Sequence, residues 1–225
     1  MANAANPRLP VVVLISGRGS NLQSIMDAAE HGSLPIDIRA VISNRPDAGG
    51  LRRAALSGIR TLVIDHTGYG SREAFDRALM TGIDTFEPAL VILAGFMRIL
   101  TPGFVRHYHG RMLNIHPSLL PDFPGLDTHA RALAAGRNLH GASVHFVTGE
   151  TDGGPVIAQV CVPVYGDDNA ATLAERVLAA EHRLYPLVIG WFAGGRVSMQ
   201  NDQLLFDGRP LQYPQRFTPE ELPAT

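Results

Sequence analysis

Residues 11–21 read Val-Val-Val-Leu-Ile-Ser-Gly-Arg-Gly-Ser-Asn, an apolar run that ends in a short loop containing two glycines. An uninterrupted apolar run is typical of a parallel strand that is buried on both faces. Residues 20–31 follow with Leu22, Ile25 and Met26 at helical spacing. A buried strand, a glycine loop and an amphipathic helix together predict the first unit of an α/β fold.

The same alternation of strand and helix continues along most of the chain. We expect strands at residues 36–43, 61–64, 90–94, 111–115, 142–147 and 156–164, and helices at residues 50–57, 71–86, 102–108 and 170–192. This pattern predicts a single doubly wound, mostly parallel sheet with helices on both faces. A C-terminal β-hairpin is expected at residues 196–205, with its turn at Asn201-Asp202.

The composition of the chain excludes several classes of protein. Its 225 residues carry a formal net charge of −2, so no basic field indicates a nucleic-acid partner. All the basic residues are arginine, which excludes a Schiff-base lysine and a P-loop lysine. No apolar stretch approaches the roughly 18 residues of a membrane span. The single cysteine, Cys161, and a start unlike a signal peptide predict a cytoplasmic protein.

The loop at residues 17–21 is the first candidate for a ligand site. Its glycines let the backbone approach a ligand, and the following helix offers free N–H groups and a positive dipole end. These features favour an anion such as phosphate. Leu22 occupies the third glycine position of the dinucleotide fingerprint, and the chain lacks the Gly-Lys pair of a P-loop. A tight structural turn is the alternative interpretation of this segment taken alone.

The second candidate is Asn114-Ile115-His116-Pro117, at the end of a predicted strand. Residues two apart on a strand point to the same side, so the side chains of Asn114 and His116 are expected to project together. An amide donor beside an imidazole suits a carbonyl that gains negative charge and then a proton. A capping asparagine and a surface histidine are the alternative interpretation.

The third candidate is Asp152, in the turn Thr151-Asp152-Gly153-Gly154-Pro155. A carboxylate held by a tight turn near an imidazole would orient that ring, although aspartate in such a turn is often only a turn former. His145 shares a strand face with Ser143, which permits a supporting role, but a satisfied half-buried histidine is the simpler interpretation. The other histidines lack metal-ligand spacing, so we expect no metal site.

Several stretches carry a resemblance to a known family. They are residues 11–21, Ala-Gly-Phe-Met-Arg-Ile-Leu at 94–100, Leu-Asn-Ile-His-Pro-Ser-Leu-Leu-Pro at 113–121, residues 141–147 and Asp-Gly-Gly-Pro at 152–155. Together they resemble the phosphoribosylglycinamide formyltransferase family, folate-dependent enzymes of purine biosynthesis, over residues 11–191. The Asn-x-His-Pro run is specific for folate formyl transferases and hydrolases, and the Gly-x-Gly-Ser-Asn loop favours this branch.

The resemblance implies a Rossmann-like formyltransferase fold, a reaction and a set of site residues. The formyl group would pass from 10-formyltetrahydrofolate to the amine of phosphoribosylglycinamide, with Asn114, His116 and Asp152 as catalytic residues. The implied substrate-binding residues are Gly19, Ser20, Asn21 and Glu181. The implied folate-binding residues are Arg72, Met97, Arg98, Ile99, Leu100, Asn114, Thr148, Gly149, Glu150, Thr151 and Asp152. A cis Leu120–Pro121 bond is also implied.

We therefore expect a disordered extension at residues 1–8, a formyltransferase domain at residues 9–195 and a hairpin and tail at residues 196–225. The domain would bind phosphate through its N-terminal half and folate through its C-terminal half. Small-molecule substrates, no nucleic acid, no membrane and no metal are expected, in a monomer or homodimer. A 10-formyltetrahydrofolate hydrolase is the nearest alternative. A methionyl-tRNA formyltransferase, an NAD-binding oxidoreductase and a non-catalytic folate or nucleotide sensor are weaker ones.

Overall fold

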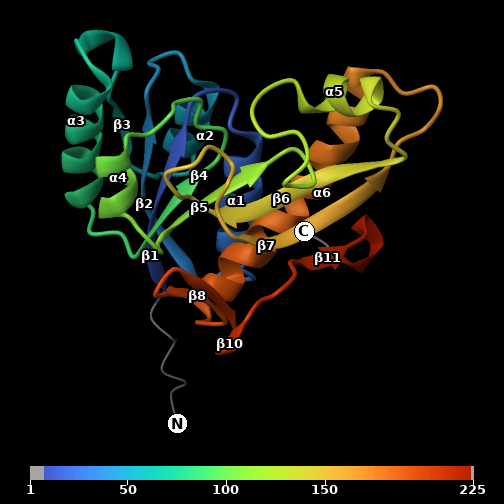
Figure 1. The fold of residues 1–225 in the computed structure, drawn as a ribbon. Coiled ribbons are helices and arrows are strands. Elements are labelled where there is room, and N and C mark those ends of the chain that lie inside the picture. The colour runs from blue at the N-terminus through green and yellow to red at the C-terminus, as the bar shows by residue number, and fades with distance from the viewer. Residues whose placement is uncertain (1–7, 224–225) are drawn as a thin grey trace.

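The computed structural model describes residues 8–223, which form an eight-stranded central sheet and a smaller three-stranded sheet (Figure 1). The central strands are β1 (Leu9–Ile15), β2 (Ile36–Ser43), β3 (Thr61–Val63), β4 (Leu90–Leu93), β5 (Met112–His116), β6 (Leu139–Phe146), β7 (Val156–Pro163) and β11 (Gln215–Phe217). Their order is β11-β7-β6-β5-β4-β1-β2-β3. Only β6 runs antiparallel to its neighbours, so the predicted mostly parallel sheet is confirmed.

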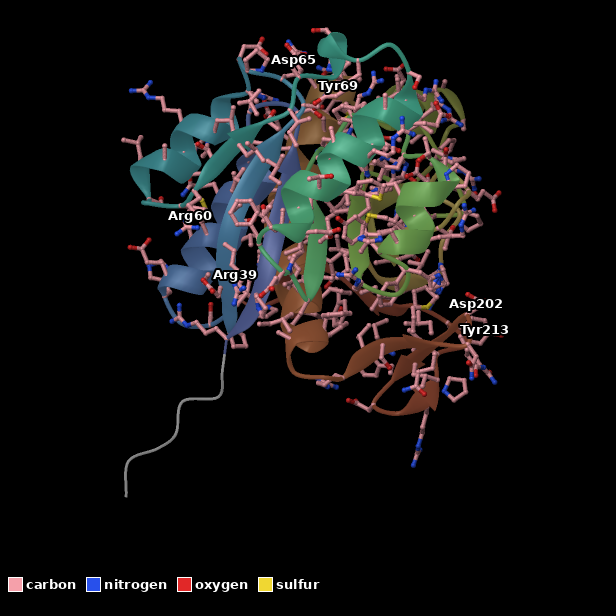
Figure 2. All side chains as sticks on the ribbon, turned by 90° about the vertical axis from the view of Figure 1, so that its left-hand side faces the viewer. Arg39, Arg60, Asp65, Tyr69, Asp202 and Tyr213 are labelled. Carbon is pink, nitrogen blue, oxygen red and sulfur yellow. The ribbon has the colours of Figure 1, made fainter. Side chains whose placement is uncertain are left out.

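The helices cover both faces of this sheet, as the alternating pattern predicted. They are α1 (Ser20–Glu30), α2 (Gly49–Leu56), α3 (Arg72–Asp84), α4 (Pro102–His107), α5 (Thr128–Ala134) and α6 (Ala170–Ala193), with short 3-10 turns η1 (His66–Gly68) and η2 (Pro219–Glu221). Viewed from the side of α3 and α4, these two helices lie in front of the strands, and Asp65 and Tyr69 lie beyond one end of the sheet (Figure 2).

The apolar run of β1 explains the two-sided architecture. Val11, Val13 and Ile15 belong to the core shared with α1 and α6, whereas Val12 and Leu14 belong to the core shared with α3 and α4. All five side chains are fully buried. Because successive strand residues point to opposite faces, a strand covered on both sides must be apolar at every position.

The long helix α6 is tied to the central strands by a buried tyrosine. Asn169 caps its first turn by accepting hydrogen bonds from the N–H groups of Ala171 and Thr172. The hydroxyl of Tyr185, on the buried face of α6, lies 2.9 Å from the carbonyl oxygen of Leu93 and 3.0 Å from that of Leu113. These two carbonyls belong to neighbouring strands β4 and β5. Tyr185 therefore fixes α6 just where the chain leads into Asn114.

The C-terminal region only partly follows its prediction. The hairpin of β8 (Val197–Gln200) and β9 (Gln203–Phe206) forms as expected, and Asn201 and Asp202 have φ of 49° and 62° at its turn. Positive φ at both central residues is the geometry of a type I′ turn. The strand β10 (Arg209–Pro210) extends this sheet. No strand was predicted in the tail beyond it, yet β11 pairs in parallel with β7 of the central sheet.

Two further differences concern short or terminal segments. Helix α5 was not predicted, because its seven residues begin at an N-cap, Asp127, whose side chain makes no capping hydrogen bond. The expected disordered extension lies outside the described residues, apart from Arg8. The proposed boundary at residue 195 stays a prediction, although β11 lies beyond it. Among residues 8–223, no helix is long and apolar enough to cross a membrane.

Replacing Tyr185 with phenylalanine is expected to lower the free energy of unfolding by about 1–3 kcal/mol, because the buried hydroxyl hydrogen shared between the Leu93 and Leu113 carbonyls is lost. Urea denaturation followed by circular dichroism measures this change. The matched control is Tyr69→Phe, since Tyr69 is 37% exposed and its loss of a hydroxyl should stay within about 0.5 kcal/mol. Equal stabilities of the two variants would contradict the role assigned to the Tyr185 hydroxyl.

Candidate active site

The loop before α1 is held in a conformation that only glycine fits. Gly19 has a φ of 72°, and a Cβ atom there would lie 2.7 Å from the Cα of Gly50. The N–H of Gly50 donates to the Gly17 carbonyl at 3.1 Å, so the loop rests directly on the start of α2. No side chain caps α1, which leaves its first-turn N–H groups available to an anion.

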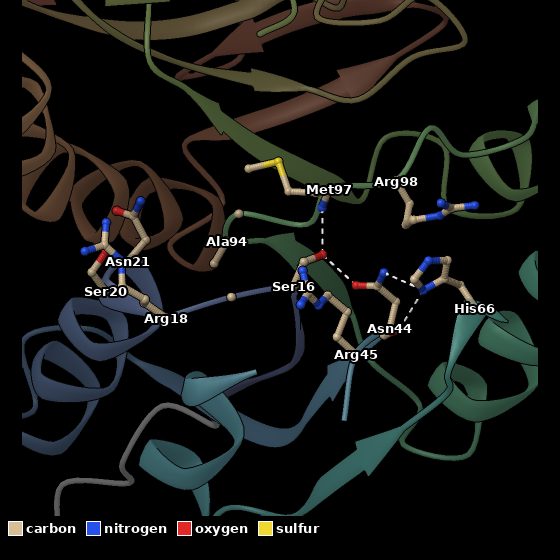
Figure 3. Close-up of a pocket in the computed structure, with 13 residues that line it drawn as sticks. Ser16, Arg18, Ser20, Asn21, Asn44, Arg45, His66, Ala94, Met97 and Arg98 are labelled. Carbon is tan, nitrogen blue, oxygen red and sulfur yellow. Dashed lines mark hydrogen bonds between the residues drawn. The ribbon is translucent and has the colours of Figure 1, made fainter. Parts of the chain in front are cut away.

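This loop lines a cavity of about 450 Å³ at the carboxyl ends of β1, β2 and β4 (Figure 3). The same cavity is lined by Asn44 and His66 and by Met97 and Arg98. The segments predicted to bind phosphate and folate therefore open into one space. An open α/β sheet generally binds its ligand at this edge.

Asn21 and Glu181 meet although they are far apart in the sequence. The amide Nδ2 of Asn21 donates to Oε2 of Glu181 at 2.7 Å. Glu181 is only 6% exposed, and burial raises the pKa of its carboxyl group to about 7, partly offset by the hydrogen bond from Asn21. Two residues predicted to bind one substrate thus form a buried pair whose charge changes near neutral pH.

The structure brings Asp152 to the ring of His116. Oδ2 of Asp152 lies 3.3 Å from Nδ1 of His116 and accepts a hydrogen bond from the Gly125 N–H at 2.9 Å. The other ring nitrogen, Nε2, donates to the Phe123 carbonyl at 3.0 Å. Because both ring nitrogens face an acceptor, this geometry is fully satisfied when the imidazole carries a hydrogen on each nitrogen.

The turn that carries Asp152 is fixed by close packing. Asp152 has a φ of 53°, in the left-handed region that few residues other than glycine, asparagine and aspartate adopt readily. A Cβ atom on Gly154 would lie 1.8 Å from the Phe146 carbonyl oxygen, so only glycine fits there. The backbone, rather than the flexibility of a side chain, sets where this carboxylate points.

Asn114 is oriented by His145, which sequence analysis had left outside the site. Nδ1 of His145 donates to the Phe146 carbonyl at 2.9 Å, and burial lowers the pKa of the ring. The neutral ring therefore accepts through Nε2, which lies 3.1 Å from Nδ2 of Asn114 and 3.8 Å from Asp152. Asn114 and His145 are direct partners in the antiparallel pairing of β5 and β6. That register has no signal in a single sequence.

Two more buried polar residues shape the loop after His116. The Ser143 hydroxyl donates to the Ser118 carbonyl at 2.7 Å and accepts from the Leu120 N–H at 3.0 Å. Nε2 of Gln159 donates to the Leu120 carbonyl at 2.8 Å. The Leu120–Pro121 bond is cis, as the resemblance implied. Gln159 was missed because a glutamine in an apolar strand gives no motif.

Of the remaining residues predicted to bind folate, Met97 and Arg98 line the cavity, whereas Arg72, Ile99, Leu100 and residues 148–151 are not among its lining residues. Met97 and Ile99 are 67% and 60% exposed, and the half-buried Arg98 lies over the ring of Phe75. Arg72 is exposed at the start of α3, and residues 148–151 lead into Asp152. Within residues 8–223, no cluster of three or more histidine, cysteine, aspartate or glutamate side chains is placed to hold a metal ion.

The formyl transferase family matches residues 9–189 of this chain. The chain belongs to that family. Phosphoribosylglycinamide formyltransferase of Escherichia coli is 53% identical over 211 residues, which cover 94% of this formyl transferase and 99% of that protein. The human trifunctional purine biosynthetic protein adenosine-3 is 46% identical over 189 residues, 84% of this chain and 19% of its own length.

A solved structure agrees with this assignment. Phosphoribosylglycinamide formyltransferase from Coxiella burnetii superposes with a TM-score of 0.90 at 52% identity, covering 93% of this formyl transferase and 99% of that chain. The family and these relatives are formyltransferase enzymes, and so is this chain.

Glu181→Gln is expected to remove a pH dependence from the stability of this enzyme. The folded-state pKa of about 7 exceeds the ordinary value of 4.5, so the carboxyl group contributes stability that is complete below pH 4.5 and is lost as pH rises through 7. As pH rises from about 4.5 to about 8, the unfolding free energy of the wild type should therefore fall relative to that of the variant, by on the order of 3 kcal/mol.

Urea denaturation across this pH range measures the difference in unfolding free energy. Glu73→Gln, at an exposed glutamate of α3, serves as the control and should track the wild type. A constant difference between Glu181→Gln and the wild type across the range would show that the Glu181 carboxyl group is not perturbed.

Proposed function

We propose that this enzyme transfers the formyl group of 10-formyltetrahydrofolate to the amine of phosphoribosylglycinamide, a step of purine biosynthesis. The observation that carries the proposal is that Asp152 lies 3.3 Å from the ring of His116 and 3.8 Å from that of His145, whose Nε2 is 3.1 Å from the amide of Asn114. An imidazole, a carboxylate and an amide donor are thereby linked at one end of β5. The names of the bacterial relatives support the same substrate.

The phosphorylated substrate is proposed to bind at the start of α1. Its phosphate would accept hydrogen bonds from the backbone of Gly19, Ser20 and Asn21, where the positive end of the helix dipole favours an anion. Glu181 would accept a hydrogen bond from the ribose or the glycinamide end. Oδ1 of Asn21 is buried and has no hydrogen-bond partner among the described residues, so it can accept a substrate hydrogen.

The folate is proposed to lie along residues 97–100 and the turn at residues 148–152, as a co-substrate rather than a resident cofactor. The exposed side chains of Met97 and Ile99 offer apolar surface to its aromatic rings. Arg98 and Arg72 would bind the carboxylates of its glutamate part. Nε of Arg98 is buried without a partner among residues 8–223, which fits an acceptor supplied by the ligand.

The chemistry begins when the substrate amine attacks the formyl carbon. A new C–N bond forms, and the former carbonyl oxygen becomes an anion that the Asn114 amide and the His116 ring stabilise. One N–H of Asn114 is already bonded to His145, which fixes the direction of the other. Collapse of the intermediate breaks the bond to N10, which receives a proton from His116. The proton of the amine leaves through water toward Asp152.

In the structure, the Phe123 carbonyl accepts the Nε2 hydrogen of His116 that this mechanism assigns to the substrate oxygen. Nε2 of His116 donates to that carbonyl at 3.0 Å. The substrate oxygen must therefore take over this hydrogen bond, which requires the segment of Phe123 to shift when both substrates are bound. Asp152 keeps its contact with Nδ1 and so fixes the orientation of the imidazole.

The finer predictions on assembly and location form part of this proposal. We propose an enzyme of the cytoplasm that acts on small molecules, as a monomer or homodimer, without a metal ion, a nucleic acid or a membrane partner. Residues 9–195 would form its catalytic domain, with the phosphate site in the N-terminal half and the folate site in the C-terminal half.

Incubation with 10-formyltetrahydrofolate should release tetrahydrofolate only when phosphoribosylglycinamide is also present. The reason is that the proposed nucleophile is the substrate amine and not water. Absorbance of the folate product, together with mass spectrometry of the formylated amine, measures both halves of the reaction. Folate turnover at the same rate without the acceptor would instead identify a hydrolase.

His116→Ala and Asp152→Ala are expected to lower kcat by at least about a hundredfold while the protein still folds. The first loses the proton donor, and the second loses the carboxylate that orients the ring and receives the proton of the amine. Steady-state kinetics and a thermal melt measure the two properties. His107→Ala, which breaks the exposed 2.9 Å pair with Asp84 far from the cavity, is the matched control. Wild-type kcat in either site variant would overturn its assigned role.

A further inference from the structure

A chain of buried and partly buried hydrogen bonds crosses the carboxyl edge of the sheet and links the residue after β1 to the loop after β4. Its members are Ser16, Asn44, His66 and Met97, and none belongs to the predicted catalytic set. The dashed lines of Figure 3 follow it from the Met97 backbone through Ser16 and Asn44 to His66. Ser16 and Asn44 are 6% and 2% exposed.

The directions of the first two hydrogen bonds in this chain follow from the Met97 N–H. The Met97 N–H can only donate, and it does so to Oγ of Ser16 at 2.7 Å. The single hydroxyl hydrogen of Ser16 therefore goes to Oδ1 of Asn44, at 2.6 Å. The amide nitrogen of Asn44 is left facing Nδ1 of His66 at 3.2 Å, and the same ring nitrogen lies 2.9 Å from the Asn44 carbonyl oxygen. Asn44 thus holds the Ser16 hydroxyl in the one orientation that accepts from Met97.

The segment between Met97 and Thr101 has few other backbone anchors. Residues 96–100 form neither helix nor strand, and the side chains of Met97 and Ile99 are largely exposed. At one end, the Met97 N–H is held by Ser16, and at the other the Thr101 N–H donates to the buried Asp76 at 2.7 Å. The backbone at each end of this segment is therefore fixed by a side chain from another element, while Phe96 and Leu100 pack against the apolar core and Arg98 lies over the Phe75 ring.

We propose that Ser16 and Asn44 are positioning residues for the folate donor, which they serve by fixing the backbone that presents Met97 and Arg98 to the cavity. The inference rests on the proposed function, because that segment is the one assigned to folate. Ser16 also immediately precedes the loop at residues 17–21, and its own N–H donates to the Gly95 carbonyl at 3.1 Å. The two substrate sites are therefore joined through a single residue.

The neighbouring Ser43 provides a control that distinguishes positioning of the folate segment from general structural support. Ser43 is fully buried at the end of β2, next to Asn44, but its hydroxyl donates to the Arg45 carbonyl at 2.8 Å, within its own turn. Removing the Ser43 hydroxyl costs a buried hydrogen bond without freeing Met97. Ser43→Ala is therefore the matched control for Asn44→Ala and Ser16→Ala.

Asn44→Ala and Ser16→Ala are expected to raise the KM for 10-formyltetrahydrofolate about five- to tenfold, the range that corresponds to one or two lost hydrogen bonds. The KM for phosphoribosylglycinamide should change less than about twofold in Asn44→Ala, and kcat should fall less than about threefold. Calorimetric titration with tetrahydrofolate should show the same loss of affinity. Ser43→Ala should leave all of these constants near their wild-type values.

The folate KM values of these variants and the binding of tetrahydrofolate to the wild type test the inference and the proposed function separately. A folate KM within twofold of the wild type in folded Asn44→Ala, or an equal rise in Ser43→Ala, overturns the inference while the proposed function stands. A wild-type protein that binds no tetrahydrofolate overturns both. If Asn44→Ala fails to fold, the test compares Ser16→Thr with Ser16→Ala. Threonine keeps the hydroxyl, so Ser16→Thr should bind folate more tightly than Ser16→Ala. Equal folate affinities of these two variants would overturn the inference.

Discussion

The approach of the Asp152 carboxylate to the His116 ring is the contact on which the rest of the site depends. The two residues are remote in sequence, and they meet because β6 runs back beside β5 and β7 beside β6. The connecting turn holds Asp152 at a left-handed φ of 53°, and Gly154 packs so closely on the Phe146 carbonyl that no side chain fits. A carboxylate placed by backbone geometry needs no reorganisation when charge develops on the ring, which is how such sites lower a barrier.

The interior of the protein has two characters. The two cores on either face of the sheet are built from aliphatic and aromatic side chains, whereas buried polar side chains gather at the carboxyl edge of the strands. Ser16, Asn44, Ser143 and Gln159 all form hydrogen bonds there with loop backbone or with one another. Burying a polar group is costly unless it is paired, and a fully paired network is rigid. The loops after β4 and β5 are held in place by these hydrogen bonds as well as by their neighbouring strands.

Burial has opposite effects on the acidic and basic groups near the cavity. It raises the pKa of Glu181 to about 7 and lowers the pKa of His145, in both cases because it disfavours the charged form. His145 consequently serves as a neutral acceptor for Asn114. His116 and Asp152 are buried as well, with side chains 7% and 11% exposed, and they lie against each other at 3.3 Å.

The sequence by itself determined the class of fold, because the apolar run of β1 and the strand and helix periods that follow it depend only on local pattern. It also identified Asn114, His116 and Asp152 as candidates, through motifs and a resemblance that the family assignment supports. Only the tertiary structure decided which residues lie beside them. His145 and Gln159 enter the site through the antiparallel register of β5, β6 and β7, and β11 joins the sheet through pairing with β7. Register is a non-local property, set by how faces pack and how turns close, so a single sequence carries no direct record of it.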